Sequence, residues 1–123
     1  MNRTELKKKI RVSSIDLLEK KGYVSSADLL IELGFLSLED YENWRFGRVP
    51  YLEKVCRGNL KKLSFIIKEL KIFSREKGLK PSWTAYNKWG KGPKKRLQFS
   101  KSGDSIIEKG YATHYVKKGR TWR

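Results

Sequence analysis

Apolar residues recur at helical spacing between Leu60 and Lys77, where every third or fourth position is a large aliphatic or aromatic side chain. Asn59 can cap the start of this helix, and Gly78 can end it. Basic residues recur at a similar spacing along another side of the same helix. The pattern therefore predicts an amphipathic helix with one face in the core and one basic face in solvent. The basic face consists of Lys61, Lys68, Lys71 and Arg75.

Shorter helices are predicted upstream, because one pattern of serine and aspartate recurs along the chain. Ser13, Ser25 and Ser37 each stand three residues before an aspartate, which is the spacing of a capping box. Glycines follow at positions where such helices can end. Together with a first helix capped by Asn2, the pattern predicts four or five helices within residues 1–78, the short ones arranged as in a helix-turn-helix.

Aromatic and mixed polar residues follow the long helix. Residues 82–89 and 94–100 have this composition, and they flank a Gly-Lys-Gly-Pro tip at 90–93. The pattern predicts a β-hairpin with a basic tip. Residues 102–110 predict another short helix, and residues 111–116 predict a third strand.

These elements predict an α+β fold, in which an N-terminal helical bundle and a long helix pack on a small C-terminal antiparallel hairpin or sheet. Residues 1–78 form the helical part of a single globular domain, 1–116, and residues 79–116 add the hairpin and the short helix. The chain of 123 residues is 38% apolar, with five Phe, six Tyr and four Trp, which is enough for one hydrophobic core. Residues 117–123 are expected to be a basic flexible tail.

The formal net charge is +16, which is extreme for a chain of this length. Residues 1–40 hold seven basic and seven acidic residues, so the whole excess lies in residues 41–123. Proteins so far from neutrality usually meet nucleic acid, an anionic membrane or an acidic partner. The sequence has no run of about 20 apolar residues that could span a membrane, and its single cysteine fits a reducing compartment. We therefore expect a cytoplasmic protein without a membrane partner.

The stretch from Lys80 to Lys101 concentrates this charge, with seven lysines and arginines, four aromatic residues and no carboxylate. Nucleic-acid bases stack on aromatic rings while basic side chains contact the phosphates. Strand alternation would place Trp83 and Trp89 on one face and Tyr86 with Lys88 on the other. The alternation leaves open whether the tryptophans lie in the core. The candidate nucleic-acid-binding residues are the basic helix face, Lys61, Lys68, Lys71 and Arg75, and, from the hairpin, Tyr86, Lys88, Trp89, Lys91, Lys94, Lys95 and Arg96.

A basic helix followed by a basic hairpin resembles, in outline, the winged helix-turn-helix DNA-binding domains, over residues 13–100. The second helix of the predicted helix-turn-helix, Leu38 to Arg45, departs from that pattern, because it carries three carboxylates that would repel a duplex, Glu39, Asp40 and Glu42. A reading helix would therefore be the long one that begins after Asn59.

Candidate catalytic groups are few. One histidine and one cysteine exclude a zinc site built from several of them, and no paired carboxylates near the hairpin could hold magnesium. No metal or other cofactor is expected. A metal-free ribonuclease of the toxin type is an alternative, with His114 or Glu108 as acid and base and Arg96 or a neighbouring lysine holding the phosphate.

The function that the sequence favours is non-catalytic nucleic-acid binding, dominated by phosphate contacts and low in sequence specificity. A third class of function is an interaction module that docks an acidic protein partner through the same charge. The sequence leaves open the choice between DNA and RNA, between single and double strands, and between monomer and dimer.

Overall fold

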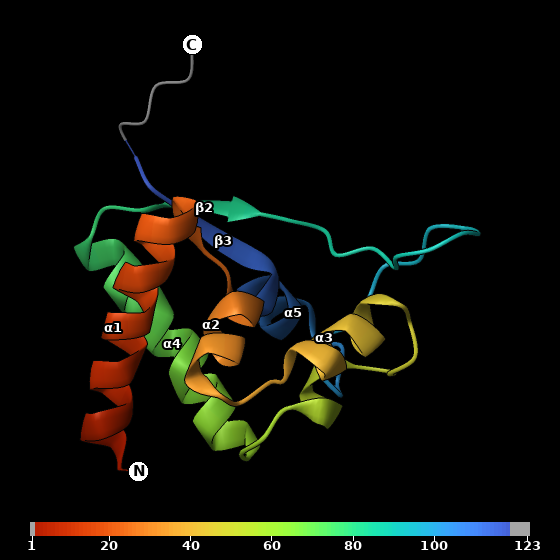
Figure 1. The fold of residues 1–123 in the computed structure, drawn as a ribbon, viewed down its shortest axis with the longest axis horizontal. Helices are drawn as coiled ribbons and strands as arrows, with labels where there is room; N and C mark the ends of the chain where they lie inside the picture. Colours follow the sequence, from red (N-terminus) through yellow and green to blue (C-terminus); the bar gives the residue numbers. More distant parts are fainter. Residues whose placement is uncertain (1, 119–123) are drawn as a thin grey trace.

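The computed structural model describes residues 2–118, in which a small antiparallel sheet lies at one edge of a group of helices (Figure 1). The α+β class predicted from the sequence is confirmed. α1 packs against both α2 and α4, and the sheet follows at the C-terminal ends of α1 and α4. The elements are α1 (Arg3–Lys21), β1 (Tyr23–Val24), α2 (Ser26–Leu33), α3 (Leu38–Arg45), the 3-10 helix η1 (Leu52–Val55), α4 (Leu60–Glu76), β2 (Lys80–Trp83), α5 (Ser105–Ala112) and β3 (Thr113–Val116).

Side-chain caps confirm most of the predicted helix starts. In four helices the oxygen of the capping side chain accepts a hydrogen bond from the backbone N–H three residues later, at 2.9–3.1 Å. Such a bond satisfies one of the unpaired donors of the first helical turn. The caps are Asn2 for α1, Ser25 for α2, Ser37 for α3 and Asn59 for α4.

The helix predicted to begin at Ser13 is not a separate element, because α1 continues through this position. Buried residues recur along one stripe of α1 from Leu6 to Leu17, and this stripe packs against α2 and α4. A break at Ser13 would turn half of the stripe away from its neighbours. The helix ends instead at Gly22, which has a φ of 81° in the left-handed region.

The three strands form an antiparallel sheet in the order β1-β3-β2, so the last strand lies between the two earlier ones. Tyr23 of β1 and Lys80 of β2 both pair with Val116 of β3, from opposite sides. Each outer strand follows directly after a long helix. The central strand β3 therefore ties the C-terminal ends of α1 and α4 together.

The hairpin predicted from residues 82–89 and 94–100 is mostly wrong, because β2 pairs with β3 and not with the second of these segments. A single bridge between Asn87 and Arg96 joins the two segments. Otherwise they belong to a long loop, residues 84–104, between β2 and α5.

Two features of this loop explain why its pairing is so short. Its tip contains Pro93, which has no N–H to donate to a ladder, and two glycines with positive φ, which suit turns rather than strands. Beyond the bridge, the buried side chains of Leu97 and Phe99 direct the chain into the core.

The core is centred on Trp44 of α3, which is completely buried. Its ring packs against Tyr86 and Phe99, with centroids 5.7 and 4.9 Å away. Its indole N–H donates to the backbone carbonyl of Gln98 at 2.8 Å. The two ends of the 84–104 loop are therefore fixed to α3 through one core residue.

The short helix predicted after residue 101 is present as α5. Asp104 caps it by accepting hydrogen bonds from two backbone N–H groups of the first turn, at 3.2 Å. Gly110, the predicted end, lies inside the helix, and a Cβ there would be 3.6 Å from Cγ2 of Ile67 on α4. α5 therefore packs close to α4. Most of the basic tail predicted for residues 117–123 lies outside the described residues.

Candidate functional site

The predicted site residues separate into two surfaces in the folded chain. One surface, which we call the groove, lies between α4, α5 and the sheet. The 84–104 loop projects beside α3, away from α1 and from the C-terminal half of α4 (Figure 1). The structure therefore does not bring the basic loop and the basic helix face together. The other surface, which we call the loop surface, consists of the exposed residues Trp83, Lys88, Trp89, Lys91, Lys94, Lys95 and Arg96.

The loop surface carries five exposed cations. They lie in a stretch of sequence that has no carboxylate between Glu76 and Asp104. Within residues 2–118, the ion pairs are formed by other lysines and arginines. The positive charge of the loop surface is therefore open to an external anion.

Trp83 and Trp89 both reach solvent. Trp83 is 51% exposed, and the guanidinium carbon of Arg96 lies 5.0 Å from the centre of its ring. Trp89 is 37% exposed and packs edge-on against Phe46, with centroids 5.4 Å apart. Each indole is thus held by a neighbour and still partly open, which is an arrangement on which a base can stack.

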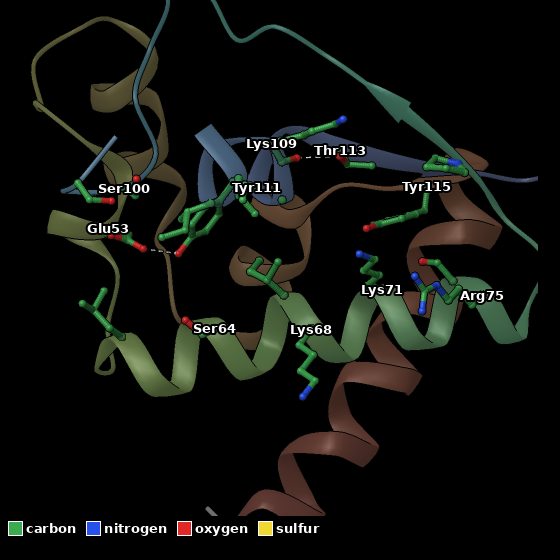
Figure 2. A pocket seen from close by; sticks show the side chains of 18 of the residues that line it. Glu53, Ser64, Lys68, Lys71, Arg75, Ser100, Lys109, Tyr111, Thr113 and Tyr115 are labelled. Atoms are coloured by element: carbon green, nitrogen blue, oxygen red, sulfur yellow. Dashed lines mark hydrogen bonds between the residues drawn. The ribbon is translucent and has the colours of Figure 1, made fainter. Parts of the chain in front are cut away.

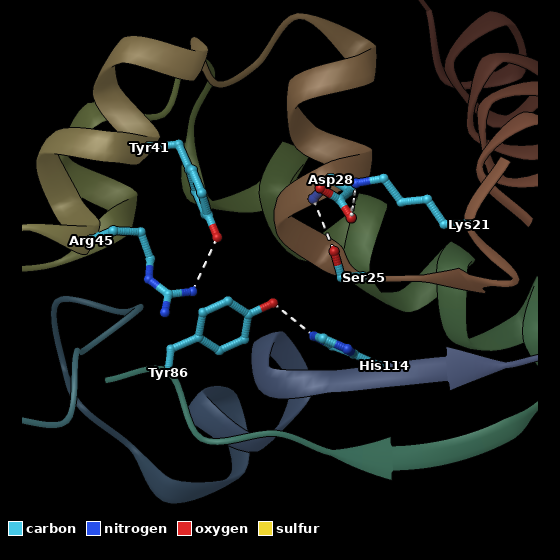
Figure 3. Close-up of polar contacts among 7 residues, drawn as sticks. All are labelled: Lys21, Ser25, Asp28, Tyr41, Arg45, Tyr86 and His114. Atoms are coloured by element: carbon cyan, nitrogen blue, oxygen red, sulfur yellow. Dashed lines mark hydrogen bonds and ion pairs between the residues drawn. The ribbon is translucent and has the colours of Figure 1, made fainter. Parts of the chain in front are cut away.

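Arg45 of α3 holds the base of the loop in place. Its guanidinium donates to the hydroxyl of Tyr41 at 3.1 Å (Figure 3) and to the carbonyl of Asn87 at 3.2 Å. The guanidinium also lies 4.6 Å from the ring centre of Trp89, whose backbone N–H donates to the Arg45 carbonyl at 2.7 Å. The sequence pattern does not reveal this positioning role, because Arg45 belongs to a helix dominated by carboxylates.

Tyr86, predicted to offer its ring to a base, is only 6% exposed and lies in the core. Its hydroxyl and Nε2 of His114 share a hydrogen bond of 2.7 Å (Figure 3). Burial raises the pKa of Tyr86 above its ordinary value. The prediction is wrong because the ring of Tyr86 packs against Trp44 and Phe99, with centroids 5.7 and 5.1 Å away.

The four basic residues predicted for one face of α4 are all exposed and follow a single stripe of the helix. The carboxylates of α4 lie elsewhere. Glu69 pairs with Lys7 of α1 at 3.7 Å, and Glu76 pairs with Arg11 of α1 at 2.7 Å. The carboxylates of α4 therefore pair with α1 and lie apart from the basic stripe of α4.

The groove has a volume of about 1060 Å³ and is bounded by α4, by α5 and by the edge of β2 and β3 (Figure 2). Lys68, Lys71 and Arg75 of the basic stripe line it, and Lys61 does not. Lys71 and Arg75 point toward Tyr115 of β3, whereas Lys68 points away from the sheet (Figure 2). The groove therefore receives only part of the predicted basic face.

Two further cations of the groove escape the sequence pattern, namely Lys101 before α5 and Lys109 within it. In the sequence, the only indication of a role for Lys101 is that it belongs to the run without carboxylates. Lys109 comes to the groove because α5 packs against α4, which no local pattern indicates.

The carboxylates beside the groove are engaged by hydrogen bonds within the fold. Glu53 accepts from the backbone N–H of Lys101 at 3.0 Å and from the hydroxyl of Tyr111 at 2.7 Å (Figure 2). Glu108 accepts from the backbone N–H groups of Phe99 and Ser100, at 2.9 and 2.6 Å. Both carboxylates hold the segment before α5 in place.

The two groups proposed as acid and base of a ribonuclease serve contacts within the fold. His114 stacks on Tyr23, with centroids 5.3 Å apart, and bonds to Tyr86. Its strand neighbours on either side line the groove, so His114 faces the opposite side of the sheet. Burial lowers the pKa of His114, and the nearby Asp28 opposes this shift. Glu108 is bonded to the loop as described above.

Among residues 2–118, no group of three or more His, Cys, Asp or Glu side chains could hold a metal ion. None of the helices in this part of the chain combines the length and apolar character that a membrane crossing requires. Comparisons with models of protein families, with curated proteins and with solved structures find no match for the chain. Its function is therefore inferred from the two surfaces themselves.

Proposed function

We propose that the chain binds nucleic acid without catalysis and contacts the phosphate backbone through the loop surface. One observation carries this proposal: five exposed cations and two partly exposed indoles lie together on the 84–104 loop and the adjoining end of β2, and the base of this loop is fixed in the core. Phosphate contacts supply most of the affinity of such a protein, and stacking adds to it without reading the base. The binding is therefore low in sequence specificity.

The anchoring of the loop supports the proposal. A segment that is ordered before binding loses less conformational entropy when the complex forms. Trp44 fixes Gln98 at one end of the loop, and Arg45 fixes Asn87 and Trp89 near the other. The cations at the tip are thus presented on a defined base.

The basic stripe of α4 supports the same function at longer range. The summed positive charge of a protein attracts a polyanion and speeds its association, even where the charged residues make no direct contact. Lys61, Lys68, Lys71 and Arg75 contribute to this field on a different side of the molecule from the loop surface.

We also propose that the fold has the outline of a winged helix. β1 lies between α1 and α2, and the long loop between β2 and α5 takes the place of a wing. The exposed carboxylates Glu39 and Glu42 of α3 make that helix unsuited to a duplex. We therefore assign the contact to the loop and not to α3.

The test is a titration of the protein into a labelled mixed-sequence single strand and into the matching duplex, followed by fluorescence anisotropy at several salt concentrations. With three to five loop cations engaged, the slope of log K against log salt should be between about −2 and −4.5. A slope near zero for both probes would contradict the proposal.

Matched variants separate the loop surface from mere net charge. Lys94→Ala with Lys95→Ala removes two exposed lysines from the loop, and Lys8→Ala with Lys9→Ala removes two from α1. The loop variant should flatten the slope by about 1.4 on a single strand, while the α1 variant should change it much less. Equal changes would show that the footprint is diffuse.

The absence of catalysis is tested on the same samples. Labelled RNA should stay intact with the wild-type protein in EDTA. If the wild type degrades RNA and a folded His114→Ala variant does not, the ribonuclease alternative replaces this proposal.

A further inference from the structure

The groove exposes more aliphatic surface than a phosphate-binding site needs. On α5, Ile106 is 81% exposed and Ile107 is 45% exposed, and at the start of α4 Leu60 is 59% exposed. All three line the same hollow. Exposed aliphatic residues that gather in one concave place indicate a docking surface, whereas scattered ones do not.

Cations line the same groove on both of its walls. Within residues 2–118, the ion pairs do not involve any of them. Glu53, which lines the groove, and Glu108 of α5 accept hydrogen bonds from the fold. The groove therefore combines an apolar floor with a rim of available positive charge. The rim consists of Lys68, Lys71, Arg75, Lys101 and Lys109.

We propose that the groove binds an amphipathic α-helix of an acidic partner protein. Helices dock in such grooves through apolar residues at i, i+3, i+4 and i+7. In this groove, these residues would pack on Ile106, Ile107 and Leu60. Carboxylates along the flanks of the helix would meet the cations of the rim, which supplies the charge complementarity that selects the partner.

A nucleic acid fits the groove less well than an acidic helix does. The aromatic rings of the groove, Tyr111 and Tyr115, are only 3% and 8% exposed, so neither offers a ring face to a base. The aliphatic floor would stay unused under a phosphate backbone. A second copy of the chain is also disfavoured, because two molecules of net charge +16 repel each other.

The probe is a synthetic helical peptide with leucines along one side and glutamates on the other. One control peptide carries lysine in place of glutamate, and another has the same composition in scrambled order. Binding to the full chain is measured by isothermal titration calorimetry. We expect binding of the acidic amphipathic peptide only, and equal binding of the scrambled peptide would overturn the proposal.

Protein variants test the floor and the rim separately. Ile106→Ser with Ile107→Ser should weaken the peptide about tenfold or more, because it removes the apolar contact at the centre of the interface. The matched control is Val12→Ser, an exposed apolar residue of α1, which should have no effect. Ile106→Ser alone should also weaken binding, and it replaces the double variant if that one does not fold.

The rim is tested by Lys71→Ala with Arg75→Ala, and its control is Lys8→Ala with Lys9→Ala. The rim variant should weaken the peptide and the control should not, while the Lys94→Ala, Lys95→Ala loop variant should bind the peptide normally. Loss of nucleic-acid binding in the Ile106→Ser, Ile107→Ser variant would assign the groove to nucleic acid and overturn the proposal. A dimer in sedimentation that this variant abolishes would show that a second copy is the occupant, with the same consequence.

Discussion

The loop surface and the groove are both positively charged, but they differ in shape. The loop projects into solvent, and Arg96 of the loop surface lies over the exposed indole ring of Trp83. The groove is concave, and both cations and exposed aliphatic side chains line it. Both attract a polyanion from a distance, so the uncharged neighbours of the cations decide which partner each surface retains. A strongly basic chain can therefore hold two sites of different chemistry.

The two surfaces are also anchored by different groups. Trp44 and Arg45 of α3 hold the loop from within the core. Glu53 and Glu108 hold the wall of the groove through charge-assisted hydrogen bonds. Substitutions at these anchors should show how far the surfaces depend on each other.

Trp44→Ala should have the largest effect, because it removes a completely buried indole that anchors the 84–104 loop in the core. The free energy of unfolding, measured by urea denaturation, should fall by about 3–5 kcal/mol. Trp83→Ala removes a half-exposed indole and is the control. Equal losses from the two variants would contradict the central role of Trp44.

Glu108→Gln should have a smaller effect that falls mainly on the groove. The amide keeps one acceptor but places an N–H₂ group against backbone donors, so the free energy of unfolding should fall by about 1.5–3 kcal/mol. Peptide binding should weaken while nucleic-acid binding stays unchanged. If both activities fell together, the two surfaces would have to be treated as one coupled site.

Trp83→Ala should weaken binding of a single strand by about 1 kcal/mol, because one stacking platform is lost. Duplex binding and peptide binding should change much less, since neither uses an open indole. Anisotropy titrations of the three probes provide the measurement. A loss of the same size on the duplex would show that the ring contributes by some means other than stacking.

The smallest predicted effect is a pH dependence that belongs to neither surface. Burial lowers the pKa of His114, so the unfolded chain takes up a proton at higher pH than the folded chain does. The free energy of unfolding should therefore decrease as the pH falls below about 6.5 and level off below the folded pKa. His114 is the only histidine, so His114→Gln should remove this slope, and an unchanged slope would rule out His114 as its source.

The helix starts could be predicted because capping is local. Ser25 and Ser37 each bond to a backbone N–H three residues away, and nothing distant is required. Ser13 has the same local pattern, but the buried stripe of α1 continues past it onto two other helices. Tertiary packing therefore overrides a capping signal where the two compete.

Strand pairing and the groove could not be predicted from local patterns. The glycines and proline of the loop tip indicate a hairpin, yet β2 finds its partner in β3, beyond an intervening helix. The groove depends on the close approach of α5 to α4 at Gly110, and this approach brings Lys109 near the basic stripe. Both outcomes depend on contacts between residues that are far apart in sequence.

The position of β3 in the sheet has a consequence for proteolysis. The loop tip offers trypsin exposed lysines beyond the Asn87–Arg96 bridge, so limited digestion should nick the chain after Lys91 or Lys94. The C-terminal fragment would still supply the central strand of the sheet and the buried rings of Phe99 and Tyr111. The nicked protein should therefore migrate as one species in native gel filtration and separate only in denaturant. Two separately produced fragments, divided at the tip, should reassemble into a complete fold.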